Sequence, residues 1–396
     1  MLETIRQFAE EQLVARGAAT DARAAHARYF AGRETDILAL WDSPRQRESY
    51  DWFTAELANL RTAFRWAADQ GDLDVAATIA TYAGFLGFLA EIYEPIAWAE
   101  ELIESARAVA HPRLAFLYVI ASLCCVAGRI EAAVGYSDAG QTVVGNDRDE
   151  VPYGVHYWLG SAYTYTGQPE RSVEWHRAQL ARGRDTHTST RASLVIALAF
   201  VGSPDEVMAA ATGLIEAAEA TRNPHALSFA LMAYGFACKN AYPNRALEAM
   251  RRGLVIAQDS GNRTIEALLA SSLALFEAIF GDPLAALEYS AVAIRNHHDA
   301  GNTANMRASL AVLAILLQRL ARHEPAATIA GFAPNPMTAV GIPEFGIAIT
   351  HLRDALGDKT YDSLARNGET MTTSAIVAYA YDQIDQARAE LSAVSK

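Results

Sequence analysis

Proline residues recur along this chain at a nearly constant interval, and this spacing limits the possible folds more than any other feature. The separations between six of them are 74, 35, 39, 40 and 42 residues, and 74 is twice 37. Proline costs little at the first position of a helix, because its missing N–H would have no intrahelical acceptor there. The prolines therefore mark helix starts in a repeated unit, at Pro95, Pro169, Pro204, Pro243, Pro283 and Pro325.

The segments between these prolines have helical spacing and are rich in alanine and leucine. A second set of breakers separates them: Gly145-Asn146, Asn223-Pro224, Gly261-Asn262 and Gly301-Asn302. Glycine followed by asparagine suits the end of a helix, where a left-handed residue stops the hydrogen-bond ladder. No stretch sustains the alternation typical of a strand. The pattern predicts antiparallel helix pairs.

One unit shows the repeat most clearly, with Leu159, Gly160 and Tyr163 followed by a turn at Gly167. This quartet is similar to the tetratricopeptide consensus, and the pitch of about 35–41 residues is slightly longer than that of the family. We predict an all-α fold, a right-handed α-solenoid of about seven tetratricopeptide-like helix pairs with helical N- and C-terminal caps. The turns within pairs are expected near Tyr93, Gly128, Gly167, Gly202, Ala241, Gly281 and Arg322.

The two ends of the chain depart from the repeat. We expect an N-terminal helical linker segment over 1–72, the repeat solenoid over 73–332 and a C-terminal helical cap over 333–396. A break at Ala333-Pro334-Asn335-Pro336 precedes the cap. Helices outside the repeat are predicted at about 2–16, 21–40, 51–69, 344–356, 358–367 and 373–391.

Three blocks in the N-terminal segment carry a family resemblance: Leu2 to Ala9, His26 to Phe30, and Glu56 to Trp66 with Gly71-Asp72 after it. Together they resemble the segment that joins the nucleotide-binding part to the helical sensor arm in bacterial NB-ARC or STAND-type signal-transduction ATPases. These include LuxR-type and AfsR-type transcriptional regulators and adenylate cyclase fusions of actinobacteria. The resemblance implies a sensor arm, with an ATPase or cyclase encoded nearby as a partner.

The chain departs from that family in what it lacks. It has no Gly-x-x-x-x-Gly-Lys-Ser/Thr motif, so we expect no ATP binding. Nothing follows the last predicted helix that could form a DNA-reading head. The resemblance therefore implies a non-catalytic regulatory, sensor or protein-interaction module that binds a protein or small effector on a concave surface. A free-standing adaptor or scaffold, and an all-α enzyme with an unrecognised site, are the alternatives.

Charge and composition restrict the partners. A formal net charge of −13 repels polyanions, so we expect no direct binding to nucleic acid. Residues 75–90 form an uncharged, largely apolar stretch of 16 residues, which is too short to span a membrane. Three cysteines cannot form a disulfide framework, and acidic residues near Met1 argue against a signal peptide. We expect a cytoplasmic protein.

Searches for catalytic motifs give no candidate, and we predict no enzyme, no cofactor and no metal site. His297 and His298 are adjacent, so on a helix they point about 100° apart and cannot face one metal ion. A solvated helix end is the interpretation for this pair. Cys124 and Cys125 lie in an apolar helix and are interpreted as buried hydrophobic residues rather than reactive thiols.

An aromatic cluster around residues 153–175 offers a possible ligand groove. Most such aromatics pack between helices, but the tetratricopeptide register places some of them on the concave face. Tyrosines there give contact area at low entropic cost, and one lysine would supply a cation for an anionic ligand. The predicted groove residues are Tyr118, Tyr157, Thr164, Tyr165 and Lys239.

Overall fold

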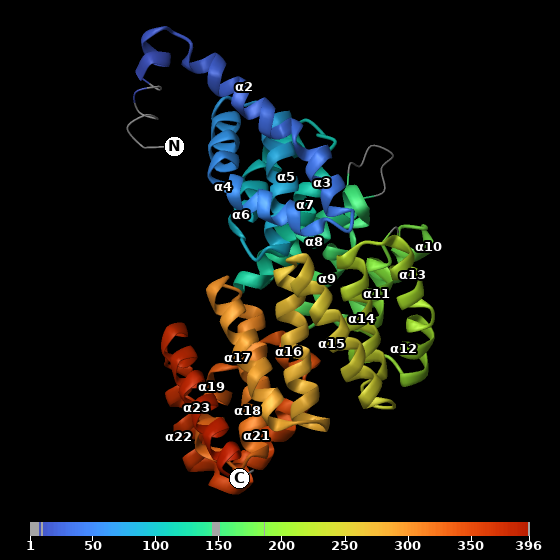
Figure 1. The fold of residues 1–396 in the computed structure, drawn as a ribbon, viewed down its shortest axis with the longest axis vertical. Coiled ribbons are helices and arrows are strands. Elements are labelled where there is room, and N and C mark those ends of the chain that lie inside the picture. The colour runs from blue at the N-terminus through green and yellow to red at the C-terminus, as the bar shows by residue number, and fades with distance from the viewer. Residues whose placement is uncertain (1–7, 9–10, 145–150, 186, 395–396) are drawn as a thin grey trace.

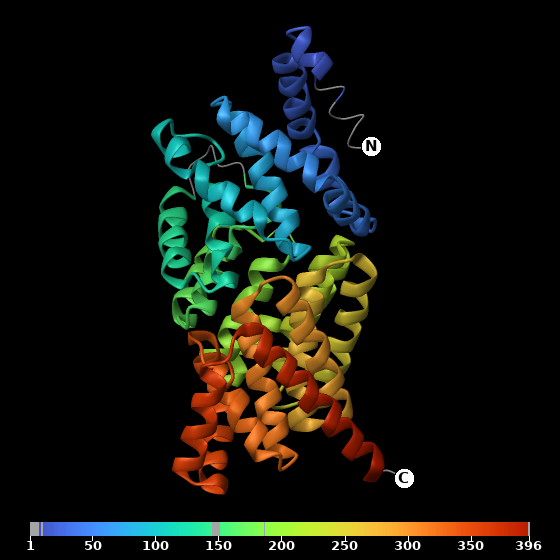
Figure 2. The same ribbon diagram turned by 90° about the vertical axis from the view of Figure 1, so that its left-hand side faces the viewer.

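The computed structural model describes residues 8, 11–144, 151–185 and 187–394. Throughout these residues the chain is helical and contains no strand. Consecutive helices pack against one another along the chain. In Figure 1 the blue and cyan N-terminal helices lie above the orange and red C-terminal ones, and Figure 2 shows the same order from the side. The predicted all-α solenoid is confirmed.

Three helices precede the repeat in the described part of the chain: α2 (Ala19–Gly32), α3 (Glu34–Trp41) and α4 (Gln46–Asp69). The helix expected over 21–40 is divided at Arg33, so that prediction is wrong in detail. The short α3 turns away and buries Trp41 against Phe85, with ring centroids 4.7 Å apart. Most of the helix expected over 2–16 lies outside the described residues.

Seven helix pairs follow within the described residues, and their turns lie where the proline and glycine spacing predicts them. The second helix of the fourth pair is interrupted at Gly213, which has a positive φ of 71°. In chain order the pairs are α5 (Leu73–Leu89) with α6 (Glu94–Ala108), α7 (Leu114–Ser122) and η1 (Leu123–Ala127) with α8 (Ile130–Val143), α9 (Tyr157–Tyr165) with α10 (Pro169–Ala181), α11 (Ser189–Val201) with α12 (Pro204–Ala211) and α13 (Leu214–Thr221), α14 (Pro224–Cys238) with α15 (Pro243–Ser260), α16 (Arg263–Phe280) with α17 (Pro283–Asp299), and α18 (Thr303–Arg319) with α19 (His323–Phe332).

The C-terminal segment forms α20 (Pro336–Gly341), α21 (Pro343–Leu356), α22 (Asp358–Glu369) and α23 (Thr373–Val394). The last three match the predicted ranges closely. The short α20 was not predicted, because its position was interpreted as a break. Asn335 caps it, accepting from Thr338 N at 2.8 Å while the Thr338 hydroxyl accepts from Asn335 N.

Three buried asparagines, each at the N-cap of the first helix of a pair, connect their helices to other parts of the chain. Asn223, Asn262 and Asn302 are 39 and 40 residues apart and at most 1% exposed. In each, Oδ1 accepts a backbone N–H of its own helix at 3.1 Å. This leaves the side-chain NH₂ of each asparagine free to donate elsewhere.

Two of the three NH₂ groups hold parts of the chain together that are distant in sequence, and the third joins adjacent helix pairs. Asn223 donates to Asp42 at 3.0 Å, and Asn302 donates to the Tyr93 hydroxyl at 3.1 Å. Both partners lie more than 180 residues earlier in sequence. Asn262 faces His225 Nδ1 of the preceding pair at 2.9 Å. Helices from the first part of the chain therefore lie against later ones, as α5 does against α16 and η1 against α18.

We expect Asn262→Ala to lower the free energy of unfolding by about 2–4 kcal/mol. The substitution removes a cap and leaves a buried N–H and His225 Nδ1 without partners. The matched control is Ser203→Ala, which removes the exposed cap of α12 and should cost only about 0.5–1 kcal/mol. Urea titrations followed by circular dichroism measure both. Equal losses in the two variants would contradict the role of Asn262 in joining helix pairs.

Candidate functional site

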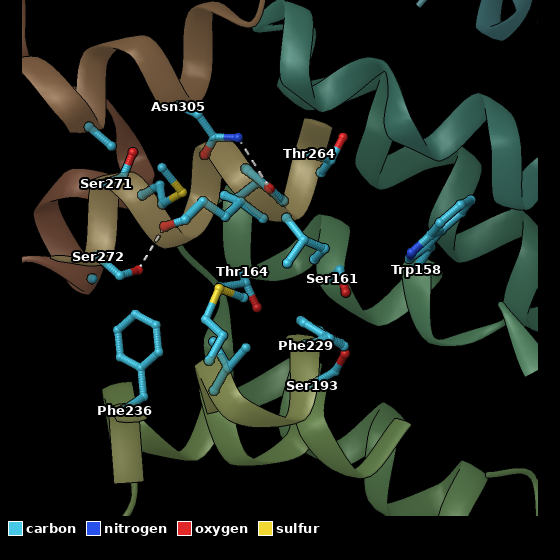
Figure 3. Close-up of a pocket in the computed structure, with 18 of the residues that line it drawn as sticks. Trp158, Ser161, Thr164, Ser193, Phe229, Phe236, Thr264, Ser271, Ser272 and Asn305 are labelled. Atoms are coloured by element: carbon cyan, nitrogen blue, oxygen red, sulfur yellow. Dashed lines mark hydrogen bonds between the residues drawn. The ribbon is translucent and has the colours of Figure 1, made fainter. Parts of the chain in front are cut away.

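A cavity of about 200 Å³ lies among the first helices of the pairs. We call it the inner pocket. It is lined mainly by α5, α9, α11, α14, α16 and α18, with contributions from η1, α10 and α20. Most of its wall is apolar or aromatic, and Figure 3 shows Phe229 and Phe236 bordering it. The larger apolar lining residues are Phe88, Leu89, Leu123, Trp158, Ile196, Phe200, Phe229, Met232, Phe236, Ile265, Leu268, Leu275, Val312, Met337 and Ile342.

The polar lining residues of the inner pocket are uncharged at neutral pH. No aspartate, glutamate, lysine or arginine lines it within the described part of the chain. In Figure 3, Ser161, Thr164 and Ser193 lie on one side of the space, with Ser271, Ser272 and Asn305 on the other. The polar set is Tyr157, Ser161, Thr164, Tyr165, His176, Ser193, His225, Thr264, Ser271, Ser272 and Asn305.

Three of the five predicted groove residues meet at the inner pocket: Tyr157, Thr164 and Tyr165. They contribute to the wall of a pocket, where Tyr157 is only 3% exposed. Tyr118 is absent from the wall. Tyr118 is buried under α8. A Cβ atom placed on Gly140 of that helix would lie 3.0 Å from the Tyr118 Cβ.

Lys239 also lies outside the inner pocket, at the C-cap of α14. Its ammonium pairs with the Glu344 carboxylate of α21 at 3.2 Å. Both side chains are largely buried, with exposed fractions of 16% and 25%. The lysine is therefore neutralised by the C-terminal segment, and the expectation that it offers a cation to a groove ligand is not supported by its position.

The two tyrosines of the inner pocket are held by partners on other helix pairs. Asn262 directs its NH₂ at His225 Nδ1, so His225 carries its proton on Nε2 and donates to the Tyr157 hydroxyl at 3.3 Å. Asn305 Nδ2 donates to the Tyr165 hydroxyl at 3.3 Å. Burial raises the pKa of both phenols, so they stay protonated.

Two polar side chains of the inner pocket have no hydrogen-bond partner among the residues that the structure describes. Neither ring nitrogen of His176 is bonded, although the residue is 0% exposed, and the Ser193 hydroxyl is unbonded at 5% exposure. Burial lowers the pKa of His176 to about 3, so its ring is neutral.

Neither residue was predicted from the sequence, and His176 lies on the second helix of its pair. Gly160 was the available signal. A Cβ there would lie 2.7 Å from the His176 ring, so only glycine leaves room for the imidazole.

The short helix α20 forms one edge of the inner pocket through Met337, Gly341 and Ile342. Its start lies against the α9–α10 turn, where a Cβ on Gly167 would come within 3.1 Å of the Pro336 carbonyl oxygen. Asn335 donates to the Ala304 carbonyl at 2.9 Å and attaches the same segment to α18. The C-terminal segment therefore contributes to the site and does more than cap the solenoid.

The other candidate residues do not form a reactive centre. Cys124 and Cys125 are buried, and burial raises the pKa of Cys124 to about 11, which keeps it as a thiol. His297 is 1% exposed, so its interpretation as part of a solvated helix end is wrong. Within the described ranges no group of three or more His, Cys, Asp or Glu residues could hold a metal ion.

No protein-family model matches the chain, and no curated protein matches it significantly. Among the helices that the structure describes, none combines the length and apolar character needed to cross a membrane.

Acid should destabilise the protein through its buried histidines. Burial lowers the pKa of His176 and of His225 to about 3 each, against 6.5 for a solvated histidine. Between these values the unfolded chain binds more protons, so stability falls as the pH drops below 6.5. Each histidine should contribute a loss of about 2 kcal/mol between pH 7 and pH 5.

Urea titrations at pH 7 and pH 5 measure this loss of stability. In His176→Phe the loss should be smaller by the contribution of one histidine, about 2 kcal/mol. An unchanged urea midpoint at pH 5 would contradict the neutral, buried state of these rings.

Proposed function

We propose that this chain is a non-catalytic regulatory module of a bacterial signalling protein, and that it senses a small effector bound in the inner pocket. The observation that carries the proposal is the pocket itself. It is apolar, lies between helix pairs and has a few convergent polar groups, which is the usual form of a small-molecule site. Three of the residues that the repeat register assigns to the inner surface line it: Tyr157, Thr164 and Tyr165.

The position of the inner pocket supports a sensing role. Its wall includes α5 and α9 from the first half of the chain and α16, α18 and α20 from the second half. A ligand that contacts all of them would stabilise one arrangement of the two halves over others. The resemblance to the sensor arms of STAND-type ATPases, carried by the N-terminal blocks, supports the same function and suggests an ATPase or cyclase as the output partner.

A second candidate function, hydrolysis, is favoured by one arrangement at the wall of the inner pocket. Ser271 Oγ lies 3.3 Å from His297 Nε2, and His297 Nδ1 lies 3.4 Å from the Glu91 carboxylate. This order matches a serine–histidine–acid triad.

Three features argue against catalysis by these residues. His297 Nδ1 and Glu91 Oε1 form no hydrogen bond, and the Ser271 hydroxyl is shared with Ser309 at 2.8 Å. Ser271 also lies in the middle of α16, where backbone N–H groups are bonded within the helix and cannot form an oxyanion hole. We therefore favour a non-catalytic module.

Filling the inner pocket should abolish binding of a small apolar probe. Ser161→Phe adds a phenyl ring to a partly exposed residue of the wall, and a ring of that size fills a cavity of about 150 Å³. We expect indene to raise the melting temperature of the native protein and to slow amide hydrogen exchange in α20. Ser161→Phe should lose both effects.

Ser363→Phe is the matched control, because Ser363 is exposed on α22 and lies outside the wall. It should respond to indene as the native protein does. Binding of indene that survives in Ser161→Phe would place the probe elsewhere and contradict the proposed function.

We expect Ser271 to be inert toward serine-hydrolase reagents. A fluorophosphonate probe should label the native protein no more than Ser271→Ala, because nothing activates the serine or stabilises an oxyanion. Mass spectrometry of the intact protein measures the labelling. Stoichiometric modification of the native protein that Ser271→Ala lacks would favour the hydrolase instead.

A further inference from the structure

We propose that a ligand in the inner pocket holds α3 against the later helix pairs, and that release of α3 is the structural change that follows when the pocket is empty. This inference rests on the proposed function and adds the element that responds to the effector. It follows from the contacts of Trp41 and Asp42 at the end of α3, which join the N-terminal segment to residues behind the pocket wall.

Trp41 lies behind the wall of the inner pocket. Its ring centroid is 5.6 Å from that of His225, a wall residue that bonds to the Tyr157 hydroxyl. It is also 4.7 Å from the ring centroid of Phe85, which stacks on the wall residue Trp158 with centroids 5.5 Å apart. Movement of Trp41 would therefore remove packing that supports the wall on both α9 and α14.

Asp42 attaches the end of α3 to two later helix pairs. Its Oδ1 accepts from His187 Nε2 at 2.7 Å and from Asn223 Nδ2 at 3.0 Å. His187 lies just before α11, and Asn223 caps α14. At the exposed edge, Arg47 Nε donates to the Asp259 carbonyl at 2.9 Å and so reaches the end of α15. We call these bonds the α3 contact.

The backbone around the α3 contact is strained. Six non-glycine residues in the described ranges have a positive φ, and three of them border this contact: Tyr153 at 52°, Thr188 at 61° and Arg222 at 55°. Tyr153 packs on Trp41 with ring centroids 5.1 Å apart, and the other two adjoin the residues that bond to Asp42. A left-handed backbone is unfavourable for a residue with a side chain and persists only where surrounding contacts impose it. Release of α3 would therefore relieve strain.

Two buried polar atoms beside the α3 contact have no hydrogen-bond partner within the described residues: Gln46 Oε1 and His187 Nδ1. The two residues are 0% and 6% exposed. A buried polar atom without a partner is unfavourable, and both atoms would gain access to water on release of α3. Strain and missing hydrogen bonds together make this contact one that a small change in free energy can open.

The ligand and the α3 contact act on the same residues from opposite sides. A ligand in the inner pocket packs against the wall that includes His225 and Trp158, and Trp41 supports both from behind, the second through Phe85. A ligand that binds the closed arrangement more tightly shifts the equilibrium toward it. By linkage, closure of the contact raises the affinity for the ligand by the same factor.

Amide hydrogen exchange of α3, with and without indene, tests this inference. A helix of eight residues is not stable alone, so α3 loses protection when its contact opens. Indene at ten times the dissociation constant measured by calorimetry should slow exchange in α3 about tenfold. Exchange in α22, which lies outside the pocket wall, should not change.

Removing the acceptor of the α3 contact should have the opposite effect. Asp42→Ala leaves two buried donors without an acceptor and should speed exchange in α3 by about tenfold or more. The matched control is Asp138→Ala. Its carboxylate likewise accepts from side chains on two other helices, Tyr163 and Arg171, but it lies outside the α3 contact and the pocket wall. It should leave exchange in α3 unchanged.

Arg47→Ala is the second variant, because it removes an exposed side chain and leaves the core intact. It should speed exchange in α3 about threefold. Its control is Arg45→Ala, since Arg45 is an exposed arginine two residues earlier that pairs with Glu48 of the following helix. Arg47→Ala decides the test if Asp42→Ala does not fold.

The outcomes separate this inference from the proposed function. Slower exchange in α3 with indene, and faster exchange in the two variants than in their controls, support it. Indene that slows exchange in α20 but not in α3 overturns the inference and leaves the proposed function intact. Unchanged exchange of α3 in the variants also overturns it, because the contact would then not hold the helix. Absence of indene binding in the calorimeter overturns both.

Discussion

The rest of the architecture depends on one kind of hydrogen bond, from a helix-capping asparagine to a group on another helix pair. Asn223, Asn262 and Asn302 each use the carbonyl oxygen for their own helix and the NH₂ for a partner elsewhere. An aspartate or serine could cap equally well, but neither offers the same pair of NH₂ donors. In an open solenoid each unit contacts only its neighbours. Here two of the three asparagines link the two halves of the chain, since Asn302 joins two helix pairs and Asn223 joins α14 to Asp42 of the N-terminal segment.

The inner pocket is a direct consequence of these links. The helix faces that would line a groove in an open array face one another, so their tyrosines become buried and acquire partners, as Tyr157 does with His225. Small residues let the wall form, since Gly160 accommodates the His176 ring and Gly167 accommodates Pro336 of α20. The result is a space whose shape depends on the relative position of distant helix pairs.

The repeat could be predicted from the sequence because its signals are local. Prolines at helix starts and glycines at turns act within a few residues, so the seven turns lie where they were expected. The long-range links could not be predicted in this way. That Asn302 meets Tyr93, or that Lys239 meets Glu344, depends on contacts between residues more than 100 positions apart. The short α20 was not predicted, because two prolines within three residues were interpreted as a break in the helical pattern. Asn335 and Thr338 nevertheless form a capping box that begins a helix there.

The dual use of the asparagines also limits how such a chain can change in length. Repeat arrays often gain or lose whole units, because each unit contacts only the adjacent ones. In this chain the insertion of one unit between Tyr93 and Asn302 would shift every later asparagine by one position along the superhelix. If the inserted unit precedes Asn223, that residue and Asn302 lose Asp42 and Tyr93 as partners, while Asn262 keeps His225 of the adjacent pair. The number of units is therefore fixed by geometry, as the number of strands is in a closed barrel.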